Sequence, residues 1–506
     1  MRIASALFAL LSAFLPAFGA DEAPRPLKLI AAHGSIRSDE ATLVWDRPEW
    51  AVKGLKYVVT QDGVKIAETD RCHLTARDLK PEHGYVFEVK ADGSPTIWTS
   101  LRLRTKAKET IVNVTAHGAL GDGKTLDTQA IQAAIDACPP GGVVLIPEGT
   151  FLSGALRLKS DLTLEIAKGG VLKGSKNPKD YLPLVRNRFE GWEMETYASL
   201  LNAGKMDHAG TASVRNLSIR GEGRLSGGGA ELAKAMIAER GMRGRGRLIC
   251  LLNAADVEIA GLTLDSSPCW TLHYIYSERI TCRGLTIQSR VRNGDGLDPD
   301  SSSDSLIFGC SFDTGDDCIA VKSGKNPEGN RIARPTERTR IFDCNFLRGH
   351  GISLGSEMSG GIRGVLVEDC VAGKLLHGFQ IKAIPARGGF IEDVTVRSCD
   401  LQKISILSDL NYNRDGEAAP TKPVFRNYRF RDIDLTKADV SKPVIILNGF
   451  AGTDNRLRDV RLEDIRLPAG ASVKIEDAED IVFTCVAGPD GKPPVFQEKN
   501  VDKVVR

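Results

Sequence analysis

The residues best suited to chemistry lie close together, in the stretch 293–324, which reads NGDGLDPDSSSDSLIFGCSFDTGDDCIAVKSG. This stretch contains seven aspartates, and two of them, Asp316 and Asp317, are adjacent. Like charges this close repel, so packing alone would not select them, and each carboxylate raises the pKa of its neighbours. A carboxyl group that is kept protonated can donate to a leaving oxygen while the others activate water, which is the chemistry of glycosidic hydrolysis.

Short strand-like segments recur after residue 111, and these must position the aspartates. Eight of them share an alternating strand, a polar pair and then a small or apolar anchor, at positions 261, 284, 310, 344, 370, 399, 433 and 465. The anchors are 23 to 34 residues apart, which suits a coil of three short strands and three turns. The pattern predicts an all-β fold, a right-handed parallel β-helix over residues 111–500, because stacked coils bury a continuous core.

Stacking of the coils would bring polar residues from distant positions together. The apolar positions that align are Leu297, Ile319, Ile352 and Phe379. Alternate positions then face outward in columns, with about 4.8 Å between coils. The predicted groups are Asp298, Ala320, Ser353 and Gln380; Asp300, Lys322, Gly355 and Lys382; and, just before the strands, Asp295, Asp317, His350 and His377. We expect Asp298, Asp300 and Lys322 to face a sugar groove, although a one-residue slip would invert this assignment.

The first twenty residues have the pattern of a targeting segment. Arg2 is followed by an apolar run that is too short to span a membrane, and then by small residues near Gly19. This pattern is typical of a secretory signal peptide over residues 1–20 and predicts a secreted or periplasmic protein. No later segment approaches the length of a membrane span, so none is expected.

Residues 27–105 differ in pattern from the rest and predict a separate small β domain. Their apolar and polar residues alternate, and Asp62-Gly63 is a typical hairpin turn. The segment from Leu79 to Tyr85 fits the tyrosine corner of an immunoglobulin-like β-sandwich. With Trp45, the segment resembles a fibronectin type III domain. A charged linker, TKAKET, follows it, and one amphipathic helix is expected at 128–137 with Asp127 as its N-cap.

Composition excludes several kinds of partner and cofactor. The net charge of +2 gives no global field, so attraction for an anionic substrate must be local, and no nucleic-acid partner is expected. The eleven cysteines include no CxxC pair and no His/Cys cluster, which argues against a zinc site. We interpret five of them as buried thiols in equivalent core positions: Cys282, Cys310, Cys344, Cys370 and Cys399. The chain is expected to be a monomer.

Four segments together resemble a known family. In order and spacing, residues 293–295 (NGD), 315–317 (GDD), 349–351 (GHG) and 381–382 (IK) resemble the signature segments of the polygalacturonases, glycoside hydrolase family 28. The segment that begins at Asn113 also resembles the start of that family's β-helix, and the similarity covers about residues 111–470. The resemblance implies a pectin-lyase-like β-helix and a bacterial type of enzyme with an N-terminal fibronectin-like domain.

The resemblance also implies roles for individual residues. It implies inverting hydrolysis of α-1,4-galacturonan, in which Asp316 is the general acid and Asp295 and Asp317 position and deprotonate water. His350 would assist the protonation state, and Lys382 would bind the galacturonate carboxylate. Direct displacement by water needs no metal and no cofactor, and none is expected. The expected partner is a pectic polysaccharide or an oligogalacturonide.

One position departs from the family pattern, which usually has Arg-Ile-Lys where this chain has Gln380-Ile381-Lys382. Glutamine cannot form the bidentate pair that arginine forms with a carboxylate. Either Arg387 replaces the missing arginine, or the preferred sugar is not a plain galacturonate. Asn293 and Tyr412 are further candidates for substrate binding, and Tyr412 could equally be an ordinary surface or core residue. The arginines of residues 239–247 could bind a polyanionic substrate, or they could be solvated charges of a surface loop.

Three alternatives stay open at this stage. The enzyme could hydrolyse another pectic linkage, such as that of rhamnogalacturonan. The aspartates could instead hold calcium in a pectate lyase. The β-helix could also bind glycans without catalysis. Exo action is favoured because the loops 183–200, 229–247 and 325–338 are long enough to block one end of a groove.

Overall fold

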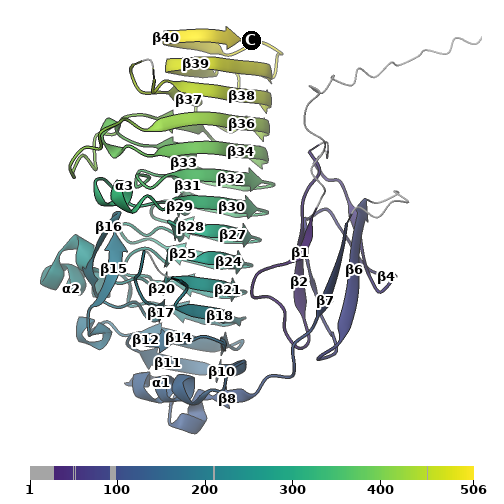
Figure 1. Cartoon of the computed structure of the whole chain (residues 1–506), viewed down its shortest axis with the longest axis vertical. Helices are drawn as coiled ribbons and strands as arrows, with labels where there is room; N and C mark the ends of the chain where they lie inside the picture. The colour runs from purple at the N-terminus through teal and green to yellow at the C-terminus, as the bar shows by residue number, and fades with distance from the viewer. Residues whose placement is uncertain (1–27, 50, 52, 92–98, 209–210, 453) are drawn as a thin grey trace, which may run out of the picture.

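The computed structural model describes residues 28–49, 51, 53–91, 99–208, 211–452 and 454–506. The predicted signal peptide lies outside these ranges, so export stays a prediction. Within the described ranges, no helix combines the length and apolar character that crossing a membrane requires. Figure 1 shows two parts side by side, a long solenoid and a small β domain packed along one flank of it.

The small domain is a sandwich of two antiparallel sheets, ordered β1-β2-β5 and β4-β3-β6-β7. Its strands are β1 (Leu29–Ala31), β2 (Ala41–Trp45), β3 (Tyr57–Gln61), β4 (Val64–Thr69), β5 (His73–Ala76), β6 (Gly84–Ala91) and β7 (Thr99–Arg104). Asp62 and Gly63 both have positive φ between β3 and β4, as a tight hairpin requires. The Tyr85 hydroxyl accepts a hydrogen bond of 2.7 Å from the Lys80 N–H, which is the geometry of the predicted tyrosine corner. The sandwich prediction is confirmed.

The solenoid is a parallel β-helix whose strands stack in three columns. The first column is β8 (Ile111–Asn113), β10 (Gly142–Ile146), β13 (Leu162–Ile166), β18 (Val214–Gly221), β21 (Ala254–Ala260), β24 (Glu278–Arg283), β27 (Ser303–Phe308), β30 (Thr336–Phe342), β32 (Ile362–Glu368), β34 (Phe390–Asp400), β36 (Val424–Asp434) and β38 (Leu457–Arg466). The second begins β9 (Asp122–Leu126), β11 (Gly149–Ser153), β14 (Gly170–Gly174), β19 (Arg224–Ser226), β22 (Thr263–Asp265), β25 (Thr286–Ser289) and β28 (Ser311–Thr314). The third is β12 (Leu156–Leu158), β17 (Leu201–Gly204), β20 (Ile249–Leu252), β23 (Leu272–Ile275), β26 (Leu297–Asp300), β29 (Ile319–Val321), β35 (Ile404–Leu407) and β37 (Ile445–Asn448).

Several long strands run through more than one column; β34, for example, continues into the second column, where its Asp400 pairs with Val371. β31 (Asn345–Leu354) and β33 (Val371–Lys382) begin in the second column and end in the third, while β39 (Ser472–Ala487) and β40 (Val495–Val505) form the last coils. The parallel registers bury one apolar core along the whole solenoid. The predicted all-β class and parallel β-helix are confirmed.

The repeat alignment was correct for the later coils and one residue out for the earlier ones. Leu262 and Leu285, rather than Gly261 and Gly284, lie in the column that continues through Cys310, because the Thr286 N–H donates to the Leu262 carbonyl and the Ser311 N–H to that of Leu285. The glycines have positive φ and form the corner before that column. All five predicted thiols are buried, but Cys282 lies in a different column, opposite Ile307.

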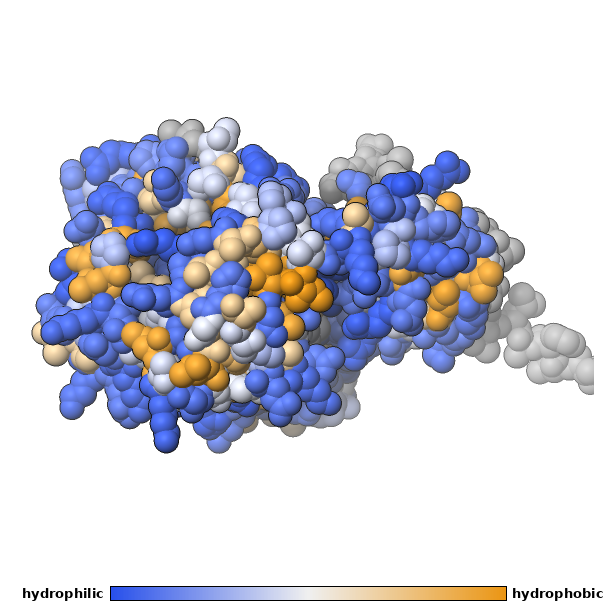
Figure 2. Space-filling view, turned by 90° about the horizontal axis from the view of Figure 1, so that it is seen from below, coloured by the Kyte–Doolittle hydropathy of each residue, from blue (hydrophilic) through white to orange (hydrophobic). Residues whose placement is uncertain are grey.

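The first coil caps the core with helix α1 (Thr128–Ala137), which has the predicted bounds. Asp127 precedes the helix, but its carboxylate accepts from the N–H groups of Leu120 and Gly121 and makes no capping bond. The predicted N-cap position is therefore confirmed, and the Asp127 carbonyl accepts from the Ile131 N–H at 2.9 Å, but the side chain binds the preceding loop instead of capping the helix. Figure 2 looks onto this end of the molecule, where apolar surface is visible; Leu120 and Ile111 are among the exposed apolar residues of the first coil.

The small domain packs against the first strand column. Phe308 and Phe342 join the apolar core of the sandwich, and the His73 ring lies 4.8 Å from that of Phe308. The Arg340 side chain donates to the Trp45 carbonyl at 3.0 Å. Because apolar core residues and buried charges are shared across this contact, the two parts form one packed unit.

Candidate active site

The third column sets the register of the candidate site. Leu297 pairs with Ile319, Ile319 with Ile352, and Ile352 with Phe379. Asp300 forms a parallel bridge with Lys322 in the next coil. The register inferred from the sequence is therefore confirmed for these four coils, and it brings Asp317 and Lys382, 65 positions apart, into contact.

Asp316 lies at the turn between β28 and β29, and His350 lies on β31 in the next coil. The His350 Nδ1 is 3.0 Å from an Asp316 carboxylate oxygen, and both side chains are about 30% exposed, at 30% and 28%. Burial disfavours the ionised form of Asp316, but the hydrogen bond and charge of His350 outweigh it and hold the Asp316 pKa below its usual value. The same hydrogen bond raises the pKa of His350 above its usual 6.5, although burial opposes the shift. The two groups form a proton-sharing pair.

Asp317 is held by residues from two further coils. Its Oδ1 accepts from the Ser353 hydroxyl at 2.7 Å, and its Oδ2 accepts from the Lys382 ammonium at 2.9 Å. Burial alone would lower the pKa of Lys382, but Asp317 outweighs it and raises that pKa. His350 is 3.7 Å from Asp317. One carboxylate is thus fixed between a hydroxyl and two cationic or potentially cationic groups.

Asp295 and Asp298 both lie beside Lys322. Their carboxylates are 3.4 Å and 3.3 Å from the Lys322 ammonium, which also faces Glu357 at 3.8 Å and the Trp270 ring at 4.4 Å. Burial and the neighbouring Asp298 carboxylate raise the pKa of Asp295 well above its usual value. Burial raises the pKa of Asp298 to about 7. In the site without substrate, Asp295 and Asp298 are therefore protonated more readily than Asp316.

Three residues that were expected to face the groove are buried instead. Asp298, Asp300 and Lys322 are 0%, 1% and 4% exposed. Asp300 accepts from the Arg188 guanidinium at 2.7 Å and lies 3.3 Å from a ring nitrogen of His273. Although burial opposes it, the charge of Arg188 and the hydrogen bond of His273 lower the pKa of Asp300 to about 2. The expectation for these positions is wrong because residues of other coils cover them. Arg188, from the hairpin of β15 (Val185–Phe189) and β16 (Trp192–Thr196), contacts Asp300, and Trp270 contacts Lys322.

Arg387 does not replace the arginine that the family pattern lacks. It is fully buried, and its nitrogens donate to the Ser356 carbonyl at 2.9 Å, to Asn326 Oδ1 at 2.5 Å and to the Asn413 carbonyl at 2.8 Å. Its guanidinium therefore ties loops together and does not face a substrate.

The remaining predicted residues occupy different positions around the cluster. Gln380 is 3% exposed and pairs with Ser353 along the third column. The Asn293 amide oxygen accepts from the Arg245 guanidinium at 2.7 Å, so that oxygen is already engaged. Tyr412 is 48% exposed, and partial burial raises its pKa, although the charge of Lys382 opposes this shift.

Sequence reasoning missed several residues of the site. Ser353 was in a predicted column but was not identified as a site residue. Glu357 and Trp270 contact Lys322, and no sequence pattern indicated these contacts because they depend on the folding of distant segments. Arg245 and Arg247 are each 1% exposed, so these two arginines of the 239–247 loop are buried anchors. The sequence signal for them was the density of arginines in a short glycine-rich loop.

One arrangement of side chains could suggest a metal. Within the described residues, ligand atoms of Asp316, Asp317 and His350 lie within 4.8 Å of one another. Calcium prefers six to eight oxygen ligands, whereas here an imidazole and the Lys382 ammonium occupy the positions beside the carboxylates. The donor set fits proton transfer better than a calcium site.

The comparisons with known proteins agree with this geometry. Residues 144–485 match the family model Glycosyl hydrolases family 28, and residues 111–176 match Rhamnogalacturonase A/epimerase, pectate lyase-like. The chain is 28% identical to an exo-poly-alpha-D-galacturonosidase of Dickeya chrysanthemi, over 91% of this chain and 90% of that protein. It is 32% identical to a probable polygalacturonase of Vitis vinifera, over 62% of this chain and 67% of that protein. A family 28 exopolygalacturonase of Yersinia enterocolitica superposes with a TM-score of 0.86 at 27% identity, covering 96% of this chain and 99% of that one.

The parallel β-helix, the crowded carboxylates and these relationships define the chain as a glycoside hydrolase. More particularly, it belongs to glycosyl hydrolase family 28. The family resemblance drawn from four short sequence segments is thereby confirmed.

Proposed function

We propose that the enzyme hydrolyses α-1,4-galacturonosyl linkages of polygalacturonan with inversion and acts from one end of the chain. The observation that carries this proposal is the cluster of Asp316, Asp317 and His350 beside the Lys382 ammonium, which lies 2.9 Å from Asp317. The carboxyl groups supply acid and base, and the ammonium attracts an anionic sugar. The names of the Dickeya and Yersinia relatives point to the same substrate.

In the proposed mechanism Asp316 donates a proton to the glycosidic oxygen. The bound substrate displaces water from the site, which raises the pKa of Asp316 and lets the His350 imidazolium pass its proton across 3.0 Å. Asp295 and Asp317 hold a water molecule, and Asp317, which is paired with the Lys382 ammonium, takes its proton as the water oxygen bonds to the anomeric carbon. The bond from that carbon to the leaving oxygen breaks, and the proton from Asp316 completes the new hydroxyl group.

The pH dependence of turnover tests the role of His350. The imidazolium is present below the raised pKa of His350, so kcat should fall as pH rises through that value. We expect His350→Gln to lower kcat about 100-fold and to remove this fall. The check is kcat measured across neutral pH in both proteins.

His377→Gln is the matched control for this experiment. The two histidine rings are 5.4 Å apart, and burial lowers the pKa of His377 to about 4, so it is neutral where His350 titrates. Its replacement should leave the shape of the profile unchanged. If both variants keep the wild-type profile, His350 does not supply the proton.

The proposal of exo action rests on a bridged wall beside the cluster, made of the β15–β16 hairpin, the loop 241–247 after α2 (Gly229–Arg240), and the loops 325–327 and 409–417. Asp415 accepts from the Arg243 guanidinium at 2.6 Å and pairs with Lys325. Both cations lie over the Trp192 ring, at 4.8 Å and 4.4 Å. A wall tied by buried and cation–π contacts would stop a polymer from passing through.

The products formed early in the reaction test exo action. Wild-type enzyme should release one short product, and viscosity should fall slowly as reducing ends accumulate. Asp415→Ala removes both bridges to Arg243 and Lys325, and should raise the share of internal cleavage severalfold. A ladder of intermediate oligomers from the wild type would exclude exo action, while no cleavage of polygalacturonan at all would exclude the proposed function.

A second candidate is hydrolysis of a different pectic linkage, such as that of rhamnogalacturonan. Gln380 in place of the usual arginine favours it, as does the partial match of residues 111–176 to a rhamnogalacturonase model. A panel of pectic polymers distinguishes the two candidates by which polymer yields reducing ends.

A further inference from the structure

Three lysines on successive coils beside the carboxylate cluster have no counterion, and we call them the basic row. Lys374 lies on β33, Lys403 lies in the turn before β35, and Lys442 lies in the turn before β37. These strands pair in that order along the solenoid. Within the described part of the chain, none of the three ammonium groups makes an ion pair or a hydrogen bond. Unpaired charges of one sign attract an anion.

The backbone around Lys403 is held in place by the preceding coil. Gly378 has a φ of +75° and passes so close that a side chain there would collide with the Lys403 backbone. The Gln402 side chain donates to the Gly373 carbonyl and accepts from the Leu375 N–H at 3.0 Å. These contacts fix the point from which the Lys403 side chain extends.

The charge of Lys403 reaches the catalytic side of the turn. The rings of His350 and His377 are 5.4 Å apart, and Lys403 belongs to the next coil. Burial is the main cause that lowers the pKa of His377 to about 4, and the charges of His350 and Lys403 add to it. Burial and the charge of Lys442 lower the pKa of Lys403 itself. Positive charge therefore continues from the cluster along the row.

One carboxylate near the end of the row is already engaged. Asp439 is influenced by the charge of Lys442, but its pKa is lowered mainly by the backbone N–H of Ser441. The Ser441 N–H and hydroxyl both donate to the Asp439 carboxylate, each at 2.9 Å. Lys442 therefore remains available to an anion from outside the protein.

The basic row and the bridged wall lie on opposite sides of the third strand column. The wall loops 325–327 and 409–417 follow β29 and β35, whereas Lys403 and Lys442 precede β35 and β37. A polymer whose end stops at the wall would extend across the column towards the row. Coils repeat at about 4.8 Å, which is roughly the length of one pyranose unit. Successive lysines can thus meet the carboxylates of successive sugar units.

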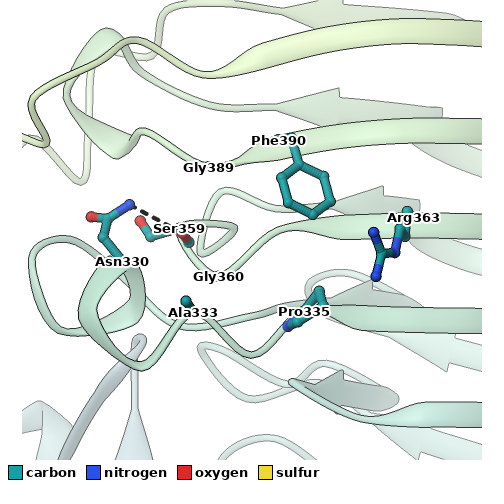
Figure 3. A pocket seen from close by; sticks show the side chains of 8 residues that line it. All are labelled: Asn330, Ala333, Pro335, Ser359, Gly360, Arg363, Gly389 and Phe390. Carbon is teal, nitrogen blue, oxygen red and sulfur yellow. Dashed lines mark hydrogen bonds between the residues drawn. The ribbon is translucent and has the colours of Figure 1, made fainter.

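The pocket drawn in Figure 3 offers no comparable charge. This cavity of about 360 Å³ lies between α3 (Glu328–Ile332) and the beginnings of β30, β32 and β34. The one charged side chain in its described lining, Arg363, already pairs with Glu337. An acidic polymer is therefore attracted to the row rather than to this pocket.

We propose that the basic row binds the carboxylates of an acidic polysaccharide on the uncleaved units that extend from the cleavage site. The half-buried Lys403 provides the fixed contact, and the exposed Lys374 and Lys442 add attraction. The row requires a chain with repeated unesterified carboxylates; that this chain is polygalacturonan rests on the proposed function. The row would increase the affinity for long chains and takes no part in bond cleavage.

Cleavage of oligogalacturonides of increasing length tests the proposal. In the wild type, kcat/KM should rise with each added unit that reaches the row. Lys403→Gln should lower kcat/KM on long oligomers about tenfold relative to the shortest cleaved oligomer, mainly through KM. Lys403→Arg should keep most of the gain because it keeps the charge. Methyl esterification of the long oligomer should lower kcat/KM of the wild type about tenfold and affect Lys403→Gln much less.

Lys173→Gln is the matched control. Lys173 is also half-buried and makes no ion pair or hydrogen bond to the described residues, but it lies on β14, in an early coil. Its dependence on chain length should match that of the wild type. Equal losses on short and long oligomers in Lys403→Gln, or a wild-type dependence on chain length, would overturn the inference.

Calorimetry separates failure of this inference from failure of the proposed function. A long oligogalacturonide is titrated into Asp316→Asn, with and without Lys403→Gln. Binding that Lys403→Gln weakens about tenfold supports the row, even if the wild type hydrolyses no galacturonan, a result that would contradict the proposed function alone. Hydrolysis by the wild type without this weakening would contradict the inference alone.

Discussion

Asp316→Asn should lower kcat on polygalacturonan about 1,000-fold and leave KM nearly unchanged, because a general acid contributes mainly to the transition state. Asparagine keeps the size of the side chain but can neither receive the proton of His350, whose Nδ1 lies 3.0 Å away, nor pass it to the leaving oxygen. Initial rates of reducing-end release measure the effect. Asp316 is partly exposed, so the melting temperature should change little.

Asp313→Asn is the control for this substitution. Asp313 lies three residues earlier, is also partly exposed, and pairs with Arg290 and Arg348 rather than with the cluster. It should keep full activity. Equal loss in both variants would assign the effect to general disturbance of the turn, and full activity of Asp316→Asn would refute the proposed mechanism.

The sequence was sufficient to predict the fold and the catalytic register because both depend on local patterns. Alternating apolar residues with a recurring anchor indicate stacked coils, and that register brings Asp317 next to Lys382, 65 positions later. The slip at Gly261 and Gly284 arose because a corner glycine and a core cysteine look alike as small anchors. The hydrogen bonds of Leu262 and Leu285, which correct it, are visible only in the fold.

The burial of the outward-facing positions could not be predicted from the same patterns. The alternation of apolar and polar residues along a strand predicts whether Asp298 and Lys322 point into or out of their own coil. It does not predict which other residues cover them. Trp270 and the hairpin that carries Arg188 provide the cover, and they come from other coils. The direction of the Asp316 pKa shift was missed for a related reason. The sequence shows neighbouring carboxylates that would raise this pKa, but only the fold shows the contact with His350, which outweighs burial and lowers it.

Lys322→Met should lower the free energy of unfolding at neutral pH by about 3 kcal/mol, since the buried carboxyl groups around it lose their cation and must either stay charged without a partner or take up a proton on folding. Lys322 is the cation that Asp295 and Asp298 both face, at 3.4 Å and 3.3 Å. Burial disfavours the ammonium, but Glu357 and Asp295 outweigh this and raise the pKa of Lys322, so it is charged throughout the range of interest. Urea unfolding at several pH values measures the loss.

The loss should shrink as the pH is lowered. The pKa of Asp298 is raised to about 7 in the folded protein, above its value in the unfolded chain, so the folded state binds more protons between these two values. Stability from this group is therefore greatest at low pH and falls as pH rises towards 7. Without Lys322 the pKa of Asp298 should rise further. At about pH 5 this carboxyl group is then protonated in the folded protein, which removes most of the loss in unfolding free energy. A loss that is independent of pH would mean that Lys322 acts through packing alone.

Asp298→Asn in the Lys322→Met background separates charge from shape. If the penalty comes from the unpaired carboxylates, the double variant should recover about half of the lost stability at neutral pH, a coupling that independent sites do not show. Glu357 provides the internal comparison, because Lys322 outweighs burial in lowering the pKa of Glu357. Loss of the ammonium should raise that pKa as well. If the double variant is as unstable as the sum of the single variants, the buried lysine does not hold the catalytic carboxylates in place, and Asp295 owes its position to the coil alone.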